Sequence, residues 1–244
     1  MNNTDTIEDI STLIGGFYNL KKTYKDNYEI GQIVYVPTLE ISQYRQVIGD
    51  NIQIHSYKNK ELIMHLRVQE EQDFRNKTRR SLVQPLENLQ ENHELVLSRA
   101  KKRPCLILAQ SRRIDVFSLP AGVQRNKALK AFYPFYFLAP LYSVSTPLKP
   151  TTFGEVLTAR IKCLVYPQFF YMPPSEKGVF VPSIARFDHL FVNQLNCGVD
   201  PTELFVIPEV LEICHDQLKQ LMGEDSSKEF KEAQEILLSY LDEN

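Results

Sequence analysis

The stretch from Lys101 to Ala109 reads KKRPCLILA, and it decides the fold class that we predict for this chain. Three cationic residues lead into a proline and then into five apolar residues. This order is typical of a strand that passes from a charged surface into a core. Similar short apolar runs recur on both sides of it, separated by prolines and polar turns. The pattern predicts a mainly β domain with helical additions, an α+β protein.

The other predicted strands follow from the same pattern. The run Ile33–Val36 is ended by a proline, and residues 51–57 and 62–68 are predicted to form a hairpin. Many short strands punctuated by prolines favour a small, tightly turned β-barrel. Further strands are predicted within residues 114–119, 128–144, 156–170 and 179–191.

Helical periodicity marks the two ends of the chain. Residues 4–25 carry one apolar face, although the two glycines at positions 15 and 16 weaken a helix there. Near the C-terminus, Pro208 suits the first turn of a helix that stops at Gly223. A second amphipathic helix is predicted over residues 226–241, and the polar segment 69–99 is also predicted to be helical.

Composition excludes several classes of protein. No apolar run among the 244 residues approaches the roughly 18 residues that a membrane helix needs. The segment Met1–Asp9 is polar and acidic, unlike a signal peptide. The four cysteines have no C-x-x-C spacing, which favours buried thiols over disulfides or zinc ligands. We therefore expect a cytoplasmic protein with no membrane contact.

The familiar signatures of metal and cofactor sites are also missing from the sequence. The five histidines show neither H-x-H nor H-E-x-x-H spacing, and we interpret each as a surface or core residue. The nine glycines form no phosphate-binding loop, and no G-x-S-x-G motif is present. The sequence predicts no cofactor and no metal site.

Charge is distributed unevenly along the chain, although the net charge is only −2. Residues 75–130 contain 13 Lys and Arg against 4 Asp and Glu, a net charge of +9, whereas residues 200–244 carry a net charge of −9. The middle of the chain can therefore face a polyanion such as RNA, and the tail cannot. The acidic tail either covers the basic surface as a built-in inhibitor or packs, like the N-terminal helix, on the domain.

Four short motifs occur in a recognisable order. GQIV at residues 31–34 opens a strand, KRPCLIL at 102–108 forms the next, APLYS at 139–143 closes another, and SIARFD at 183–188 precedes the Pro208 helix. This order resembles the MazF/PemK family of toxin endoribonucleases, whose SH3-like barrel contains an R-P strand, a P-[IL]-T-S strand and an S-x-[AV]-x-x-[DE] strand. The resemblance implies that fold for about half of the chain.

The chain departs from that family in several places. Residues 37–101 form a long insertion after the first strand, and Tyr142 stands where the family has a threonine. If the third strand is misplaced, Ser118 would replace Ser143 as the nearby hydroxyl. We predict three parts: an N-terminal helical segment (1–30), a barrel domain (31–222) that contains the insertion, and a C-terminal acidic helix (223–244).

The activity that the resemblance implies is metal-independent cleavage of single-stranded RNA by attack of its own 2′-OH. Arg103 would hold the phosphate with its planar guanidinium and Ser143 would orient it, while Tyr142 would contact the RNA. Family members are homodimers that bind an antitoxin protein. Four cations join Tyr142 as the predicted RNA contacts, namely Lys101, Lys102, Arg112 and Arg113.

Two alternatives remain open at this stage. The replacement at Tyr142, the insertion and the extra helices also suit a catalytically inactive MazF-like module that binds a protein, as an adaptor or regulator in a toxin–antitoxin or antiviral defence system. The third hypothesis is that the protein poisons DNA gyrase, because that class of toxins shares the barrel.

Overall fold

A computed structural model of the chain describes two compact units, formed by residues 1–37 with 102–244 and by residues 38–101. The structure describes nine segments: residues 9–24, 27–39, 46–56, 61–68, 96–97, 100–111, 134–145, 153–195 and 198–242. The predicted strand at 114–119 and most of the predicted helix at 69–99 lie outside them.

The smaller unit contains a three-stranded sheet with the order β3-β2-β4. The predicted hairpin is confirmed, because β2 (Gln46–Ser56) and β3 (Glu61–Val68) pair antiparallel. Strand β4 is the short segment Val96–Leu97. The predicted end of the first strand at Pro37 is wrong, since β1 (Gln32–Leu39) continues through that residue.

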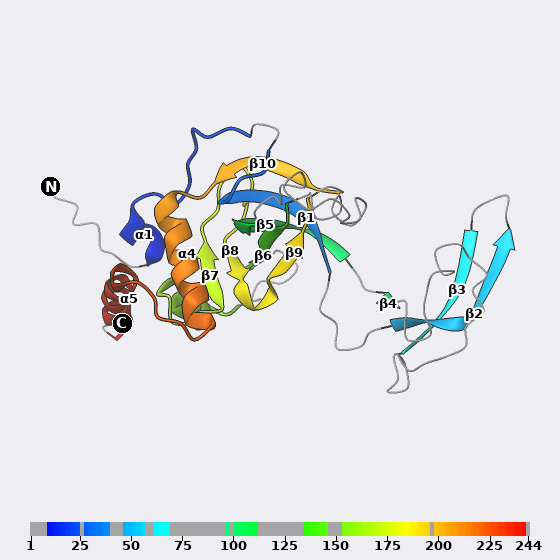
Figure 1. Cartoon of the computed structure of the whole chain (residues 1–244). Helices are drawn as coiled ribbons and strands as arrows, with labels where there is room; N and C mark the ends of the chain where they lie inside the picture. The colour runs from blue at the N-terminus through cyan, green and yellow to red at the C-terminus, as the bar shows by residue number, and fades with distance from the viewer. Residues whose placement is uncertain are drawn as a thin grey trace, which may run out of the picture. The chain divides into compact units, whose positions relative to one another are not determined.

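The larger unit is built on a seven-stranded antiparallel sheet, so the α+β class is confirmed (Figure 1). The pairing order is β10-β1-β5-β6-β8-β7, and β9 pairs with β6 beside β8. Among the described residues no ladder joins β10 to β7, so the sheet is open. The strands are β5 (Ala100–Gln110), β6 (Tyr136–Ser143), β7 (Phe169–Met172), β8 (Ser183–Arg186), β9 (Phe191–Asn193) and β10 (Asp200–Phe205).

Helices cover one face of this sheet and form the main core with it. Leu106, Leu141 and Phe170 are buried there against α1 (Ile10–Ile14), α4 (Pro208–Leu221) and α5 (Lys228–Asp242). Figure 1 shows these three helices gathered at one side of the strands. Burial of each large apolar side chain stabilises the fold by about 1.5–3 kcal/mol. Both terminal helices therefore pack on the domain.

The opposite face carries two smaller apolar clusters. One surrounds Val34, Cys105 and Leu138. The other surrounds Tyr171 and Ile184 and is covered by α3 (Glu155–Lys162) through the buried Ile161 and the partly buried Leu157. Alternate residues of the same strands thus face two different environments.

Strand β6 changes its partner at Pro140. This residue has no N–H to donate to a neighbouring strand. On one edge of β6, the ladder with β5 extends from Tyr136 to Pro140, which pairs with Cys105. On the other edge, β8 pairs with residues 141–143 and β9 with residues 136–138. Between β8 and β9 the chain leaves the ladder as the short 3-10 helix η3 (Phe187–His189).

Two further sequence expectations need correction in the described part of the chain, and one strand was missed. Helix α1 is much shorter than predicted, because Gly15 adopts a left-handed conformation (φ 69°) and ends it. Residues 156–162 of the strand expected within 156–170 are helical, as part of α3, and only residues 169 and 170 belong to a strand, β7. Strand β10 was not predicted, and it pairs with β1 at the edge of the sheet.

The two ends of the open sheet approach each other through the loop between β7 and β8. The Tyr35 hydroxyl of β1 donates to the Gly178 carbonyl at 3.0 Å. A Cβ on Gly178 would lie 3.3 Å from the Thr202 side chain of β10, so the loop contacts both strands closely. None of the helices that the structure describes has the length and apolar character required to span a bilayer.

Candidate functional site

Arg103 and Tyr142 lie side by side on neighbouring strands. Strands β5 and β6 pair antiparallel with Cys105 opposite Pro140, and continuing this register brings Arg103 opposite Tyr142. The Arg103 Cζ lies 4.5 Å from the centroid of the Tyr142 ring, a cation–π contact. Both side chains are half-buried. The strand pairing that the two motifs require is therefore present.

A second guanidinium reaches the same ring from the end of β8. Arg186 Cζ lies 5.6 Å from the Tyr142 centroid and 5.4 Å from the Phe169 centroid. Tyr142 pairs with Ile184 across the β6–β8 ladder, which places the end of β8 beside it. The Tyr142 ring thus has two arginines as neighbours, one from each flanking strand.

The Tyr142 hydroxyl forms a hydrogen bond with a histidine of η3. Its oxygen lies 3.0 Å from His189 Nδ1. Asp188 Oδ2 lies 3.9 Å from His189 Nε2, which favours a proton on Nε2 and leaves Nδ1 to accept the hydroxyl hydrogen. Asp188 also accepts hydrogen bonds from Nε and Nη2 of Arg186. The imidazole therefore lies between the hydroxyl, to which it is hydrogen-bonded, and the carboxylate, which is at ion-pair distance.

The surroundings of His189 keep its imidazole neutral at pH 7. Burial lowers the pKa of His189 below its usual value, and the nearby charges of Arg186 and Arg103 lower it further against the opposing effect of Asp188. Burial alone would raise the pKa of Asp188, but hydrogen bonds and charge from Arg186 outweigh burial and hold it below the usual value. A neutral base beside an ionised carboxylate is the result.

The structure does not bring Ser143 to this cluster. Along β6, Ser143 alternates with Tyr142 and shares a face with Leu141, whose side chain lies in the helix-covered core. It pairs with Ser183 at the end of the β6–β8 ladder. Its predicted role in orienting a phosphate stays a prediction without support from proximity to Arg103.

The predicted RNA-contacting cations fall in different places. Lys102 forms an ion pair with Asp200, with Nζ 2.5 Å from Oδ2. Lys101 is exposed on β5. Arg112 and Arg113 lie outside the described residues. Of the cations named from sequence, Arg103 alone is shown in contact with Tyr142.

Sequence reasoning missed Arg186, Asp188 and His189 as members of the site. The motif at 183–188 was recognised, but only as a strand, and His189 was interpreted as a surface or core residue. Pro140 could have indicated these residues. A proline in a strand cannot donate a ladder hydrogen bond, so the neighbouring strand is expected to end beside it and to continue as a turn. Across the described segments, no group of three or more His, Cys, Asp or Glu side chains is arranged to hold a metal ion.

The chain matches no protein-family model, no curated protein and no solved structure. Its function is therefore argued from the geometry of this cluster, which we call the Arg–Tyr–His site: Arg103, Tyr142, Arg186, Asp188 and His189.

Proposed function

We propose that the chain is an endoribonuclease that cleaves single-stranded RNA through attack of the 2′-OH on the adjacent phosphate. The observation that carries the proposal is a hydroxyl bonded to a neutral imidazole, with a guanidinium on each flanking strand. Guanidinium groups stay charged and match two phosphate oxygens at once. They supply the positive charge that the reaction needs, so no metal enters the proposal.

The reaction balances as a proton relay through Tyr142. As the 2′-oxygen bonds to phosphorus, its proton passes to the Tyr142 oxygen, and Tyr142 passes its own proton to His189 Nδ1. The Asp188 carboxylate stabilises the imidazolium that forms. When the bond from phosphorus to the 5′-oxygen breaks, the relay runs in reverse and protonates the leaving oxygen. The products are a 2′,3′-cyclic phosphate and a 5′-hydroxyl.

Arg103 and Arg186 would act on the phosphate during this step. Negative charge builds on the non-bridging oxygens as the fifth bond to phosphorus forms, and nearby fixed cations stabilise it. Arg186 is oriented by its hydrogen bonds to Asp188, which limits the side-chain freedom that it would lose on binding RNA.

The MazF/PemK-like barrel is part of the proposal. It is supported by the adjacency of the R-P strand β5 and the P-L-Y-S strand β6, and by the contacts of the β7–β8 loop with β1 and β10. Gly31 also fits a strand-opening glycine, because its φ of 85° and the 3.3 Å approach of Val206 disfavour a side chain there. A homodimer, an antitoxin partner and a cytoplasmic location belong to the same proposal.

An inactive protein-binding module is the second candidate, and one observation favours it. Phe137 and Val192 pair across the β6–β9 ladder, yet they are 44% and 51% exposed. Contiguous exposed apolar surface is a feature of protein–protein contact sites. This candidate predicts no cleavage of RNA under any condition.

The decisive experiment is an RNA cleavage assay with the full chain in excess chelator. We expect 2′,3′-cyclic phosphate ends, and no cleavage where the target nucleotide is a deoxynucleotide. Arg103→Ala and His189→Ala should each lower the rate by about 10²–10³. Arg160→Ala, an exposed arginine on α3, is the matched control and should keep full activity. Intact RNA at high protein concentration would reject the proposal in favour of the protein-binding module.

A further inference from the structure

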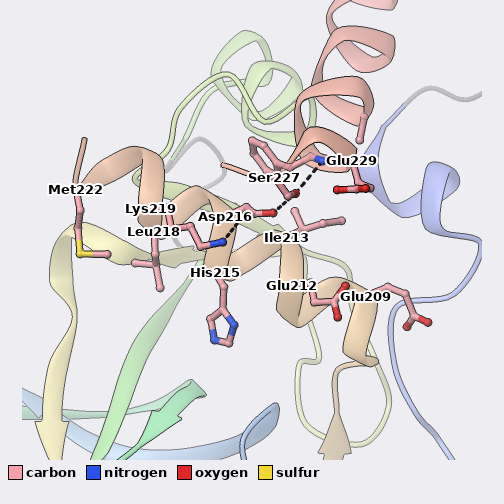
Figure 2. A pocket seen from close by; sticks show the side chains of 12 residues that line it. Glu209, Glu212, Ile213, His215, Asp216, Leu218, Lys219, Met222, Ser227 and Glu229 are labelled. Carbon is pink, nitrogen blue, oxygen red and sulfur yellow. Dashed lines mark hydrogen bonds and ion pairs between the residues drawn. The ribbon is translucent and has the colours of Figure 1, made fainter. Parts of the chain in front are cut away.

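A pocket of about 770 Å³ lies between α4 and α5, away from the Arg–Tyr–His site. Apolar side chains from both helices line it, among them Ile213 and Leu218 of α4 and Phe230 and Ala233 of α5. Figure 2 shows Met222 at one end of the pocket, and its side chain is 66% exposed. We call this feature the α4–α5 groove. Packed interiors contain few voids larger than a water molecule, so a pocket of this size between two helices is unusual.

Three carboxylates lie along one side of the groove, opposite Met222. Glu209 and Glu212 project from the first half of α4, and Glu229 projects from the start of α5 (Figure 2). All three are exposed. Within the segments that the structure describes, no Lys or Arg lies at ion-pair distance from any of them. Lys219 also lines the pocket, but its ammonium pairs with Asp216 at 2.6 Å, so the three glutamates leave this side of the groove, the acidic rim, with a net negative charge.

A buried polar anchor joins the two helices beside the groove. Asp216 is buried on α4, accepts a hydrogen bond from Lys219 Nζ at 2.6 Å and accepts another from the Ser227 hydroxyl that precedes α5. Burial alone would raise the pKa of Asp216, but these hydrogen bonds outweigh it and lower the pKa. The anchor connects the start of α5 to α4. It therefore fixes the position of the two helices that line the groove.

We propose that the α4–α5 groove binds a basic amphipathic helix of a partner protein. Apolar side chains at helical spacing on the partner would enter the lining between Ile213, Leu218 and Ala233. Lysines and arginines beside that stripe would face the three glutamates on the rim. Helix α4 has 14 residues and is therefore about 21 Å long, so a partner helix of about four turns matches it.

The position of α5 explains why this chain does not fill the groove itself. Phe230 and Leu237 are buried in the main core. The apolar face of α5 therefore packs on the domain, and little of it is left for the groove. The remaining side of the groove is left to solvent and to the acidic rim. Charge complementarity therefore selects a cationic partner, and the apolar lining selects one with an amphipathic face.

The test uses the full chain and a fluorescently labelled peptide of about 16 residues. The peptide carries leucines at i, i+3, i+4 and i+7 with lysines on the flanks, and its binding is measured by anisotropy. Glu209→Gln, Glu212→Gln and Glu229→Gln combined should weaken binding at least about tenfold, which is about 1.4 kcal/mol. The matched control combines Glu155→Gln, Glu176→Gln and Glu235→Gln, exposed glutamates outside the pocket lining, with the same change in net charge. It should bind the peptide like the unaltered chain.

Two further peptides make the outcome decisive. A scrambled peptide of the same composition lacks the apolar stripe and should bind at least about tenfold more weakly. Equal binding of the scrambled peptide, equal loss in both glutamine triples, or displacement of the peptide by spermine at equal concentration would each overturn the proposal. Since the groove lies apart from the Arg–Tyr–His site, RNA cleavage should be the same in both triples, so the two proposals fail independently.

Discussion

The two faces of the seven-stranded sheet come from the same strands and serve different ends. On the helix-covered face, Leu106 and Leu141 are buried beneath α1, α4 and α5. One residue along β6 from Leu141, on the other face, Tyr142 contacts two arginines and a histidine. The alternation of side chains along a strand lets one element provide a buried core face and a polar surface together. Substitutions on the two faces should therefore have separable effects.

The largest expected effect is on the helix-covered face. Leu106 is fully buried in the main core, and Leu106→Ala should lower the free energy of unfolding by about 2–5 kcal/mol through lost burial and the cavity left behind. Chemical denaturation monitored by circular dichroism measures this loss. The rate per folded molecule of RNA cleavage should remain within about twofold. A loss below about 1 kcal/mol would show that this face is not the main core.

Tyr142→Phe tests the opposite face with the smallest possible change. It removes the hydroxyl that bonds to His189 and keeps the ring that Arg103 and Arg186 contact. We expect cleavage to fall by about 10²–10³ while the free energy of unfolding changes by about 1 kcal/mol or less. Tyr35→Phe is the control, because its hydroxyl also makes one hydrogen bond but lies outside the site. Equal activity in both variants would contradict the relay.

The smallest expected effect is a pH dependence of stability and of RNA cleavage. It should arise from His189, on the face that carries Tyr142. The pKa of His189 is lowered in the folded chain, so the unfolded chain binds the proton more readily. His189 therefore contributes stability that is present above its unfolded pKa of about 6.5 and is lost as the pH falls through the folded pKa. Cleavage should follow the same direction, because only the neutral imidazole accepts the proton from Tyr142.

Profiles of kcat/KM and of unfolding free energy between about pH 4.5 and 8 check this prediction. The acid limb of kcat/KM should have its midpoint below about 6.5, and the His189→Gln variant should lose that limb along with most of its activity. Leu106→Ala should keep the midpoint of the unaltered chain. A midpoint above about 7 would show that His189 is not the proton acceptor.

Local sequence patterns predicted the parts of the fold whose burial is set by nearby residues. β5 and β6 were found because their apolar runs are short and flanked by polar or charged residues, and α4 because Pro208 and Gly223 bound its amphipathic repeat. Where composition and packing disagree, the prediction was wrong. A strand was predicted within residues 156–170, yet residues 155–162 form a helix over Tyr171 and Ile184. Strand β10 is polar and has no local strand pattern. It forms because it pairs with β1.

For the site, the sequence by itself determined the strands that carry Arg103 and Tyr142, because charge, proline and apolar runs are local signals. Only the tertiary structure decided that these two residues share a face, that Ser143 lies on the other, and that Arg186, Asp188 and His189 join them. The physical reason is strand pairing: register and the break at Pro140 bring together side chains that no spacing along the chain connects.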